Sequence, residues 1–122
     1  FKANTDDLRD SPALGVAALL KQAGAELVAF DPGVDPASTL IDPALLAVVD
    51  DPVEAVRDAE AVVVLTEWPE FRALDWTALG EVVGTRLVVD TRNLLDADVM
   101  RRAGFTWVGV GRRMRDRPAA SV

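Results

Sequence analysis

At 122 residues the chain is long enough for one domain with a buried core, and half of its residues are hydrophobic. It has no cysteine and no histidine, which excludes disulfides, a thiol nucleophile, a histidine general base and the usual zinc sites. The net charge of −7 argues against a nucleic-acid surface. There is no run of about eighteen apolar residues and no visible secretory signal pattern, so a cytoplasmic protein without a membrane span is expected.

Strand-like and helix-like runs alternate along the chain. This alternation predicts an α/β fold of the Rossmann-like, doubly wound kind, with a mainly parallel sheet and helices on both faces. The first helix is predicted to begin at Pro12 after a serine cap at Ser11 and to end at Gly24. A short apolar strand over residues 26–30 follows it.

The middle of the chain contains both its least regular and its most hydrophobic segments. Residues 34–49 are rich in proline and are expected to form a loop, which could include a helical turn within 43–48. A helix is expected over residues 52–59. Residues 61–65 are short, apolar and β-branched, which is typical of a central strand buried on both faces.

The last third is predicted to continue the alternation. The expected elements are a helical turn through Phe71, helices over 77–83 and 96–103, and strands over 87–90 and 106–110. The opening Phe1-Lys2 is typical of the end of a strand, and residues 112–122 are expected to be a poorly ordered tail. Residues 1–111 are therefore taken as one domain.

In sheets of this kind, ligands bind at the carboxyl ends of the strands. Three segments directly follow predicted strands and are candidates for a site: residues 2–9, 66–68 and 90–93. If Lys2, Arg9 and Arg92 converge at this edge, they would form a clamp for phosphates, with bidentate contacts from arginine and a point charge from lysine. The alternative is that each is a solvated surface cation.

For the other candidate residues, a structural role is favoured over a binding or catalytic one. A self-sufficient dinucleotide site needs a glycine-rich turn after the first strand, whereas residues 3–7 contain no glycine. Asp31 is therefore expected to act in its turn rather than hold a ribose. Asp6 and Asp7 are expected to stabilise a helix N-terminus rather than bind metal or act as acid and base. No catalytic or metal-binding residue is expected in this chain.

Glu67 and Trp68 follow the most hydrophobic strand. A tryptophan in this position usually packs against the edge of the core, and we favour packing over a role as a pocket wall. Glu67 is expected to orient a nearby cation.

Four sequence elements occur in order and cover nearly the whole chain. They are Phe-Lys-Ala-Asn-Thr-Asp-Asp-Leu-Arg-Asp-Ser-Pro at 1–12, Phe-Asp-Pro at 30–32, Leu-Thr-Glu-Trp-Pro-Glu-Phe at 65–71 with Leu-Asp at 74–75, and Val-Asp-Thr-Arg-Asn at 89–93. Together they resemble the C-terminal, nucleotide-sugar (UDP)-binding domain of the UDP-glucose/GDP-mannose dehydrogenase family. Each element alone is weak evidence for the family, but four elements in order at consistent spacing make the resemblance specific.

The resemblance implies a share in an NAD-dependent, four-electron oxidation of a sugar C6 alcohol to a carboxylate, most commonly UDP-glucose to UDP-glucuronate. It implies that NAD is bound mainly by an N-terminal Rossmann domain, and that the nucleophilic cysteine and its helpers lie outside this chain. The implied partners are the UDP-sugar substrate, the N-terminal and central helical domains of the same enzyme, and further copies in a homo-oligomer.

By position, Phe1, Lys2 and Arg92 match residues that hold the nucleotide-sugar, and Arg9 matches the arginine that reaches NAD across the domain cleft. The resemblance leaves open whether the substrate is UDP-glucose, GDP-mannose or UDP-N-acetylmannosamine. A non-catalytic α/β binding module that kept the fold is the remaining alternative.

Overall fold

The computed structural model describes residues 12–37 and 41–110 of the chain. The predictions for Phe1, Lys2, Arg9 and the tail over 112–122 lie outside these residues. The helices are α1 (Pro12–Gln22), α2 (Pro52–Val56), α3 (Trp76–Val82) and α4 (Ala97–Arg102), with a short 3-10 helix at Pro69–Phe71. The strands are β1 (Val28–Phe30), β2 (Ala47–Val49), β3 (Val62–Val64), β4 (Leu87–Asp90) and β5 (Thr106–Gly109).

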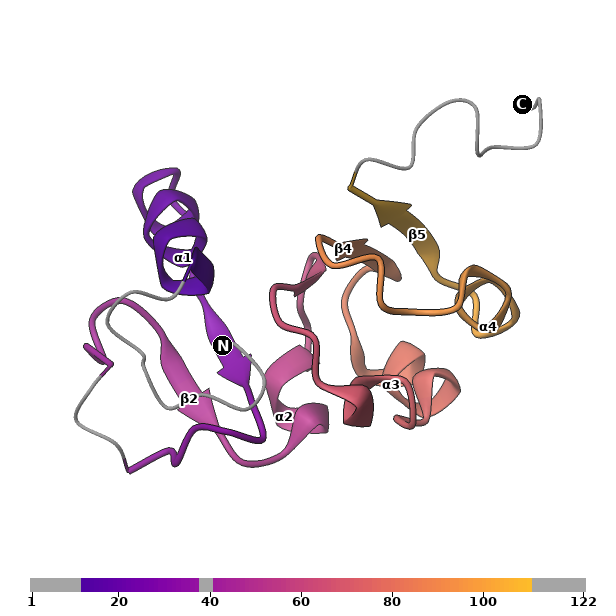
Figure 1. The fold of residues 1–122 in the computed structure, drawn as a ribbon, viewed down its shortest axis with the longest axis horizontal. Helices are drawn as coiled ribbons and strands as arrows, with labels where there is room; N and C mark the ends of the chain where they lie inside the picture. The colour runs from indigo at the N-terminus through magenta and orange to yellow at the C-terminus, as the bar shows by residue number, and fades with distance from the viewer. Residues whose placement is uncertain (1–11, 38–40, 111–122) are drawn as a thin grey trace.

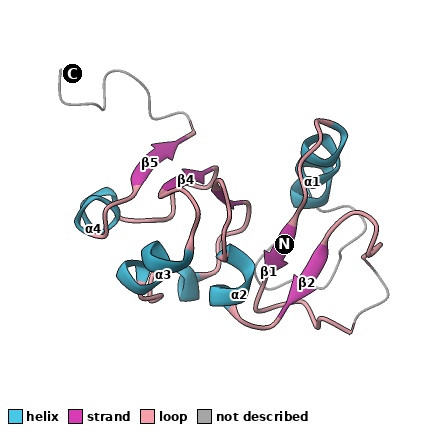
Figure 2. Ribbon diagram, turned by 180° about the vertical axis from the view of Figure 1, so that it is seen from behind, coloured by secondary structure: helices cyan, strands magenta, loops and turns pink. Residues whose placement is uncertain are grey.

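The described strands form two parallel sheets (Figures 1 and 2). In the first, β1 pairs with β2, and Val28 lies opposite Ala47. In the second, β4 lies between β3 and β5, and Val62 lies opposite Val88. Helices α3 and α4 each connect a strand to its parallel neighbour, whereas α2 connects β2 of the first sheet to β3 of the second. This arrangement confirms the predicted α/β class with parallel pairing.

Helix ends are fixed by local sequence. The carboxylates of Asp51, Asp75 and Asp96 accept backbone N–H groups at the starts of α2, α3 and α4 at 2.8–3.0 Å. Gly24 and Gly104 follow α1 and α4 with φ of 101° and 88°, where a side chain would be strained.

Strand β2 was not predicted. The segment before it makes the expected turn, in which the N–H of Leu45 donates to the carbonyl of Asp42 at 2.9 Å. The next residues, however, pair with β1 along its whole length. The expectation of a loop through Val49 was wrong. A run of three residues forms a strand only when a neighbouring strand completes its hydrogen bonds, and here that neighbour is β1.

The expectation that residues 61–65 form a central strand buried on both faces was also wrong for the described chain. Strand β3 lies at the edge of its sheet. Val64 is 5% exposed, but its neighbour Val63 is 37% exposed. The physical reason is that no described strand pairs with the outer edge of β3.

The main core lies between the β3–β4–β5 sheet and α3 and α4. Val88 and Met100 are fully enclosed there. The ring of Trp76 meets that of Phe105 edge-on at 5.5 Å, and its indole N–H donates to the carbonyl of Phe71 at 2.9 Å. A second, smaller cluster packs α1 on the β1–β2 sheet through Ala17, Val34, Ile41 and Leu46.

Candidate functional site

The carboxyl ends of the strands from both sheets meet at one edge. Asp31 directly follows β1, and Thr66 lies two residues beyond the end of β3. Both side chains are buried, and the Thr66 hydroxyl donates to Oδ2 of Asp31 at 3.3 Å. This is the edge at which parallel α/β sheets bind ligands. The structure therefore brings the turn after β1 against the segment after β3, which is one of the three segments that the sequence predicted to lie at this edge.

The turn after β1 is held by a hydrogen bond to Asp31 and is covered by the indole of Trp68. Oδ1 of Asp31 accepts the N–H of Gly33 at 2.8 Å, which is the turn role that the sequence predicted for this aspartate. The indole of Trp68 lies on the same turn, since a Cβ on Gly33 would stand 2.6 Å from Cζ2 of Trp68. Trp68 also packs against the main core, which confirms the packing interpretation. Its buried Nε1 has no hydrogen-bond partner in the described structure.

A buried carboxylate organises the loop after β4. Asp90 is fully buried, and its Oδ2 accepts the N–H of Leu95 at 2.7 Å and the indole N–H of Trp107 at 3.2 Å. Its Oδ1 accepts the backbone N–H of Arg92 at 3.1 Å. Three donors compensate the loss of hydration that burial of a carboxylate entails. Asp90 therefore fixes the backbone that carries Arg92.

The same loop is tied to both neighbouring strands. The hydroxyl of Thr91 donates to the carbonyl of Val64 in β3 at 2.6 Å. The side-chain amide of Asn93 donates to the carbonyl of Val110, just after β5, also at 2.6 Å. Asn93 has φ of 52°, a left-handed conformation that asparagine tolerates better than most residues. The residues before and after Arg92 are thus hydrogen-bonded to the two neighbouring strand segments.

Arg92 projects from this loop toward the segment after β3. Its Nη2 contacts the carboxylate of Glu67, and the side chains are 43% and 56% exposed. This confirms that Glu67 orients a cation at the edge. An exposed ion pair adds only about 0–1 kcal/mol of stability, so its main consequence is the placement of the guanidinium. The guanidinium's other N–H groups suit an anionic ligand.

Sequence reasoning did not single out Asp90 or Arg72 as residues that shape the site. Nε of Arg72 donates to the carbonyl of Leu94 at 2.8 Å and supports the loop after β4 from the 3-10 helix. The position of Asp90 at the end of an apolar strand could have indicated its role, because a carboxylate buried there needs hydrogen-bond donors around it. Arg72 gives no such signal, because its partner is a backbone carbonyl 22 residues away.

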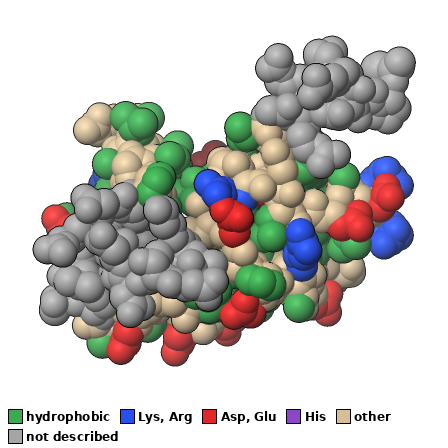
Figure 3. All heavy atoms as spheres, in the orientation of Figure 1, with side chains coloured by type: hydrophobic (Ala, Val, Ile, Leu, Met, Phe, Trp, Pro, Cys, Tyr) green, Lys and Arg blue, Asp and Glu red, His purple; other side chains and the backbone are tan. Residues whose placement is uncertain are grey.

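Of the four predicted binding residues, the structure places Arg92 at the carboxyl ends of the strands, just after β4, whereas Phe1, Lys2 and Arg9 lie outside the described residues. Within 12–37 and 41–110, no three or more carboxylates are grouped so as to hold a metal ion. None of the helices in these ranges is long and apolar enough to cross a membrane. On the face in Figure 3, the coloured basic side chains are scattered, some of them beside acidic ones, and form no broad positive patch.

Comparison with known proteins adds independent evidence. Residues 1–97 match the family model described as the UDP-glucose/GDP-mannose dehydrogenase family, UDP binding domain. A UDP-glucose 6-dehydrogenase of Rhizobium meliloti (strain 1021) is 45% identical over 113 residues, which cover 92% of this chain and 25% of that protein. The relative TuaD of Bacillus subtilis (strain 168), also a UDP-glucose 6-dehydrogenase, is 32% identical and covers 92% of this chain and 24% of its own length.

Solved structures show the same fold. An NDP-N-acetyl-D-galactosaminuronic acid dehydrogenase from Methanosarcina mazei Go1 superposes with a TM-score of 0.76 at 27% identity, over 95% of this chain and 24% of that one. The UDP-N-acetyl-mannosamine dehydrogenase Cap5O from S. aureus gives 0.68 at 27% identity, over 91% of this chain and 24% of that one. The chain thus spans about a quarter of the proteins that it matches. It belongs to the UDP-glucose/GDP-mannose dehydrogenase family and corresponds to the family's UDP binding domain.

Proposed function

We propose that this chain is the C-terminal, UDP-sugar-binding domain of an NAD-dependent UDP-glucose 6-dehydrogenase that oxidises UDP-glucose to UDP-glucuronate. The observation that carries the proposal is the placement of Arg92 at the carboxyl edge of the parallel strands, on a loop fixed by the buried Asp90. The 45% identity to a UDP-glucose 6-dehydrogenase supports the choice of substrate.

In this proposal, Arg92 binds the anionic part of the nucleotide-sugar. A guanidinium can make two parallel hydrogen bonds to phosphate or carboxylate oxygens, and such charge-assisted bonds are about twice as strong as neutral ones. Glu67 holds the guanidinium over the edge before the ligand arrives. A loop that is already ordered loses less conformational entropy on binding, which favours affinity.

Phe1 and Lys2 complete the proposed nucleotide-sugar site, and Arg9 reaches NAD. A self-sufficient dinucleotide site needs a glycine-rich turn after the first strand, and residues 3–7 contain no glycine. NAD is therefore proposed to be held mainly by another domain of the enzyme. The chain has no cysteine or histidine, so its own part is to bind and orient the substrate. The complete enzyme is proposed to be cytoplasmic and homo-oligomeric.

The test compares two arginine variants of the complete enzyme by NADH formation. Arg92→Ala should lower kcat/KM for UDP-glucose by about 10- to 100-fold, since hydrogen bonds to charged groups contribute about 1.5–3 kcal/mol. Arg101→Ala is the matched control, because Arg101 is also exposed and paired with a carboxylate, Asp98, but lies in α4 before β5. Equal kinetics of the Arg92 variant and the wild type would contradict the proposed role of this edge.

A substrate panel tests the sugar assignment separately. UDP-glucose should be oxidised faster than GDP-mannose and UDP-N-acetylmannosamine. The solved structures that match at 27% identity carry names of dehydrogenases for N-acetylated sugars, so preference for such a substrate is the second candidate. Absence of NADH formation with every nucleotide-sugar would instead favour a non-catalytic module.

A further inference from the structure

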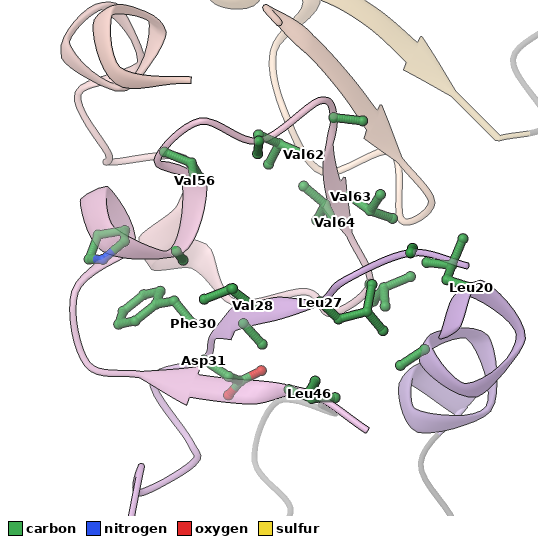
Figure 4. Close-up of a pocket in the computed structure, with 18 of the residues that line it drawn as sticks. Leu20, Leu27, Val28, Phe30, Asp31, Leu46, Val56, Val62, Val63 and Val64 are labelled. Atoms are coloured by element: carbon green, nitrogen blue, oxygen red, sulfur yellow. The ribbon is translucent and has the colours of Figure 1, made fainter. Parts of the chain in front are cut away.

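Arg92 is the described cation on which the proposed anion site depends. The cavity between the two sheets has a volume of about 770 Å³ and is lined mainly by apolar side chains, such as Leu20 and Val28 (Figure 4). The cation among the described residues that line it, Arg57, is bonded to Glu54. The cavity therefore offers no substitute for Arg92, and binding of an anion depends on how firmly the loop after β4 is held.

The β5 segment holds this loop on both sides of Arg92. Before the arginine, Asp90 accepts the indole N–H of Trp107 at 3.2 Å. After the arginine, Asn93 donates to the carbonyl of Val110, just after β5, at 2.6 Å. Asp90 passes its restraint on, because its Oδ1 accepts the backbone N–H of Arg92 at 3.1 Å. Trp107 is therefore linked through a single carboxylate to the backbone of the ligand-edge arginine.

Gly109 leaves the space in which these contacts form. It lies opposite Asp90 in the parallel register and two residues after Trp107, so all three positions share one face of the sheet. The indole leans along β5 across the glycine, since a Cβ there would stand 2.5 Å from Cη2 of Trp107. The same Cβ would stand 2.6 Å from Oδ1 of Asn93. Gly109 has no positive φ, so the glycine is required for room rather than for backbone conformation.

The indole N–H separates the role of Trp107 from core packing. The ring packs against the main core, and a phenylalanine ring would also pack there. Phenylalanine, however, has no group that can donate a hydrogen bond to Asp90. Because the carboxylate of Asp90 is fully buried, water does not readily replace a lost donor, and the loop conformation loses stability. The polar atom of Trp107 thus contributes to the placement of the loop beyond what packing supplies.

We propose that Trp107 is a positioning residue for binding of the nucleotide-sugar, and that the missing side chain of Gly109 is the space it needs. Trp107 acts through Asp90 on the backbone of Arg92 and keeps the guanidinium at the ligand edge before the ligand arrives. The inference rests on the proposed function, in which Arg92 binds the anionic part of the ligand. Without the indole donor, the loop populates conformations that cannot bind, and the apparent dissociation constant rises as the competent fraction falls.

Steady-state kinetics of the complete enzyme separate positioning from packing. In Trp107→Phe, the KM for UDP-glucose should rise about three- to ten-fold, while kcat and the KM for NAD stay within about two-fold of wild type. A purely structural loss would instead reduce the amount of active enzyme, and so kcat, at an unchanged KM. Trp76→Phe is the matched control, because it also removes an indole donor from the main core, one bonded to the carbonyl of Phe71. Its KM for UDP-glucose should equal that of wild type, and an equal KM in Trp107→Phe would overturn the proposal.

Gly109→Ala tests the space that the indole occupies. It should raise the KM for UDP-glucose, and its effect should be smaller in the Trp107→Phe background, because phenylalanine lacks the Cη2 and Cζ2 atoms that the new Cβ would meet. Gly84→Ala is the control, since its Cβ would lie 2.9 Å from the carbonyl oxygen of Asp58 but before β4, at the opposite end of that strand from the loop. It should lower stability without a change in KM. Independent effects of the changes at 107 and 109 would contradict the role of Gly109.

Hydrogen exchange of the complete enzyme gives a readout that does not depend on activity. In Trp107→Phe, the amide of Arg92 should exchange about ten-fold faster than in wild type, because its acceptor Asp90 is held less firmly. Unchanged exchange there would overturn the proposal. Arg92→Ala separates this inference from the proposed function. If Arg92→Ala raises the KM for UDP-glucose and Trp107→Phe does not, the inference alone is overturned; if Arg92→Ala has no effect, the proposed function is overturned and the inference with it.

Discussion

Removal of the Asp90 carboxylate should release the loop that carries Arg92. The carboxylate accepts three donors, of which the N–H of Leu95 is buried, while the other two are partly buried. An unsatisfied buried donor costs about 1–3 kcal/mol. Because water can reach the partly buried groups, we expect Asp90→Ala to destabilise the loop by about 3 kcal/mol in total.

Hydrogen exchange at the amide of Leu95 in the complete enzyme measures this loss directly. A change of about 3 kcal/mol corresponds to roughly a hundred-fold faster exchange, since each 1.4 kcal/mol is a factor of about ten. Asp90→Asn should show a smaller effect, because its amide oxygen can still accept two of the hydrogen bonds. Exchange at Leu95 that stays within about two-fold of wild type in Asp90→Ala would refute the reasoning.

Asp96→Ala is the control for this experiment. Asp96 is also an aspartate that accepts backbone N–H groups, at 2.8 and 3.3 Å, but it is exposed at the start of α4. Loss of such a cap costs about 1 kcal/mol and should accelerate exchange in the first turn of α4 instead of at Leu95.

Three further substitutions test the packing of the domain by thermal unfolding of the complete enzyme. Gly33→Ala should destabilise the enzyme by about 1–3 kcal/mol, because the added Cβ would lie 2.6 Å from Cζ2 of Trp68. Gly15→Ala in α1 should instead stabilise it by about 0.5–1 kcal/mol, because the added Cβ meets no atom within 4 Å and alanine favours a helix. A stabilising Gly33→Ala would show that the turn is looser than described. Trp76→Phe should lower stability by about 1–3 kcal/mol, since it leaves the buried carbonyl of Phe71 without its indole donor; an unchanged midpoint would contradict that hydrogen bond.

Local chemistry made much of the fold predictable. The capping aspartates at positions 51, 75 and 96 and the glycines at 24 and 104 act within their own turns, so helix ends can be identified without knowledge of the fold. Strand β4 is a short apolar run and was predicted over the residues that it occupies, 87–90. The edge at which the candidate site lies also follows from the alternation of elements alone.

The candidate site was predictable in part, because its residue types are informative but its contacts are long-range. Arg92 and Glu67 were singled out as a cation and its orienting carboxylate, and the structure joins them across 25 residues. The role of Asp90 was missed, since its buried state depends on donors that include Trp107, 17 residues away. The roles of Phe1, Lys2 and Arg9 stay predictions.

The sequence by itself determined the helices, most of the strands and the family, because caps, apolar runs and motif spacing are properties of neighbouring residues. Only the tertiary structure decided that residues 47–49 form a strand and that 62–64 lie at a sheet edge, because strand identity and order depend on hydrogen bonds between distant segments. The apolar run at 61–65 nevertheless has the composition of an interior strand. Composition is a property of neighbouring residues, whereas exposure depends on which distant segments pair with the strand.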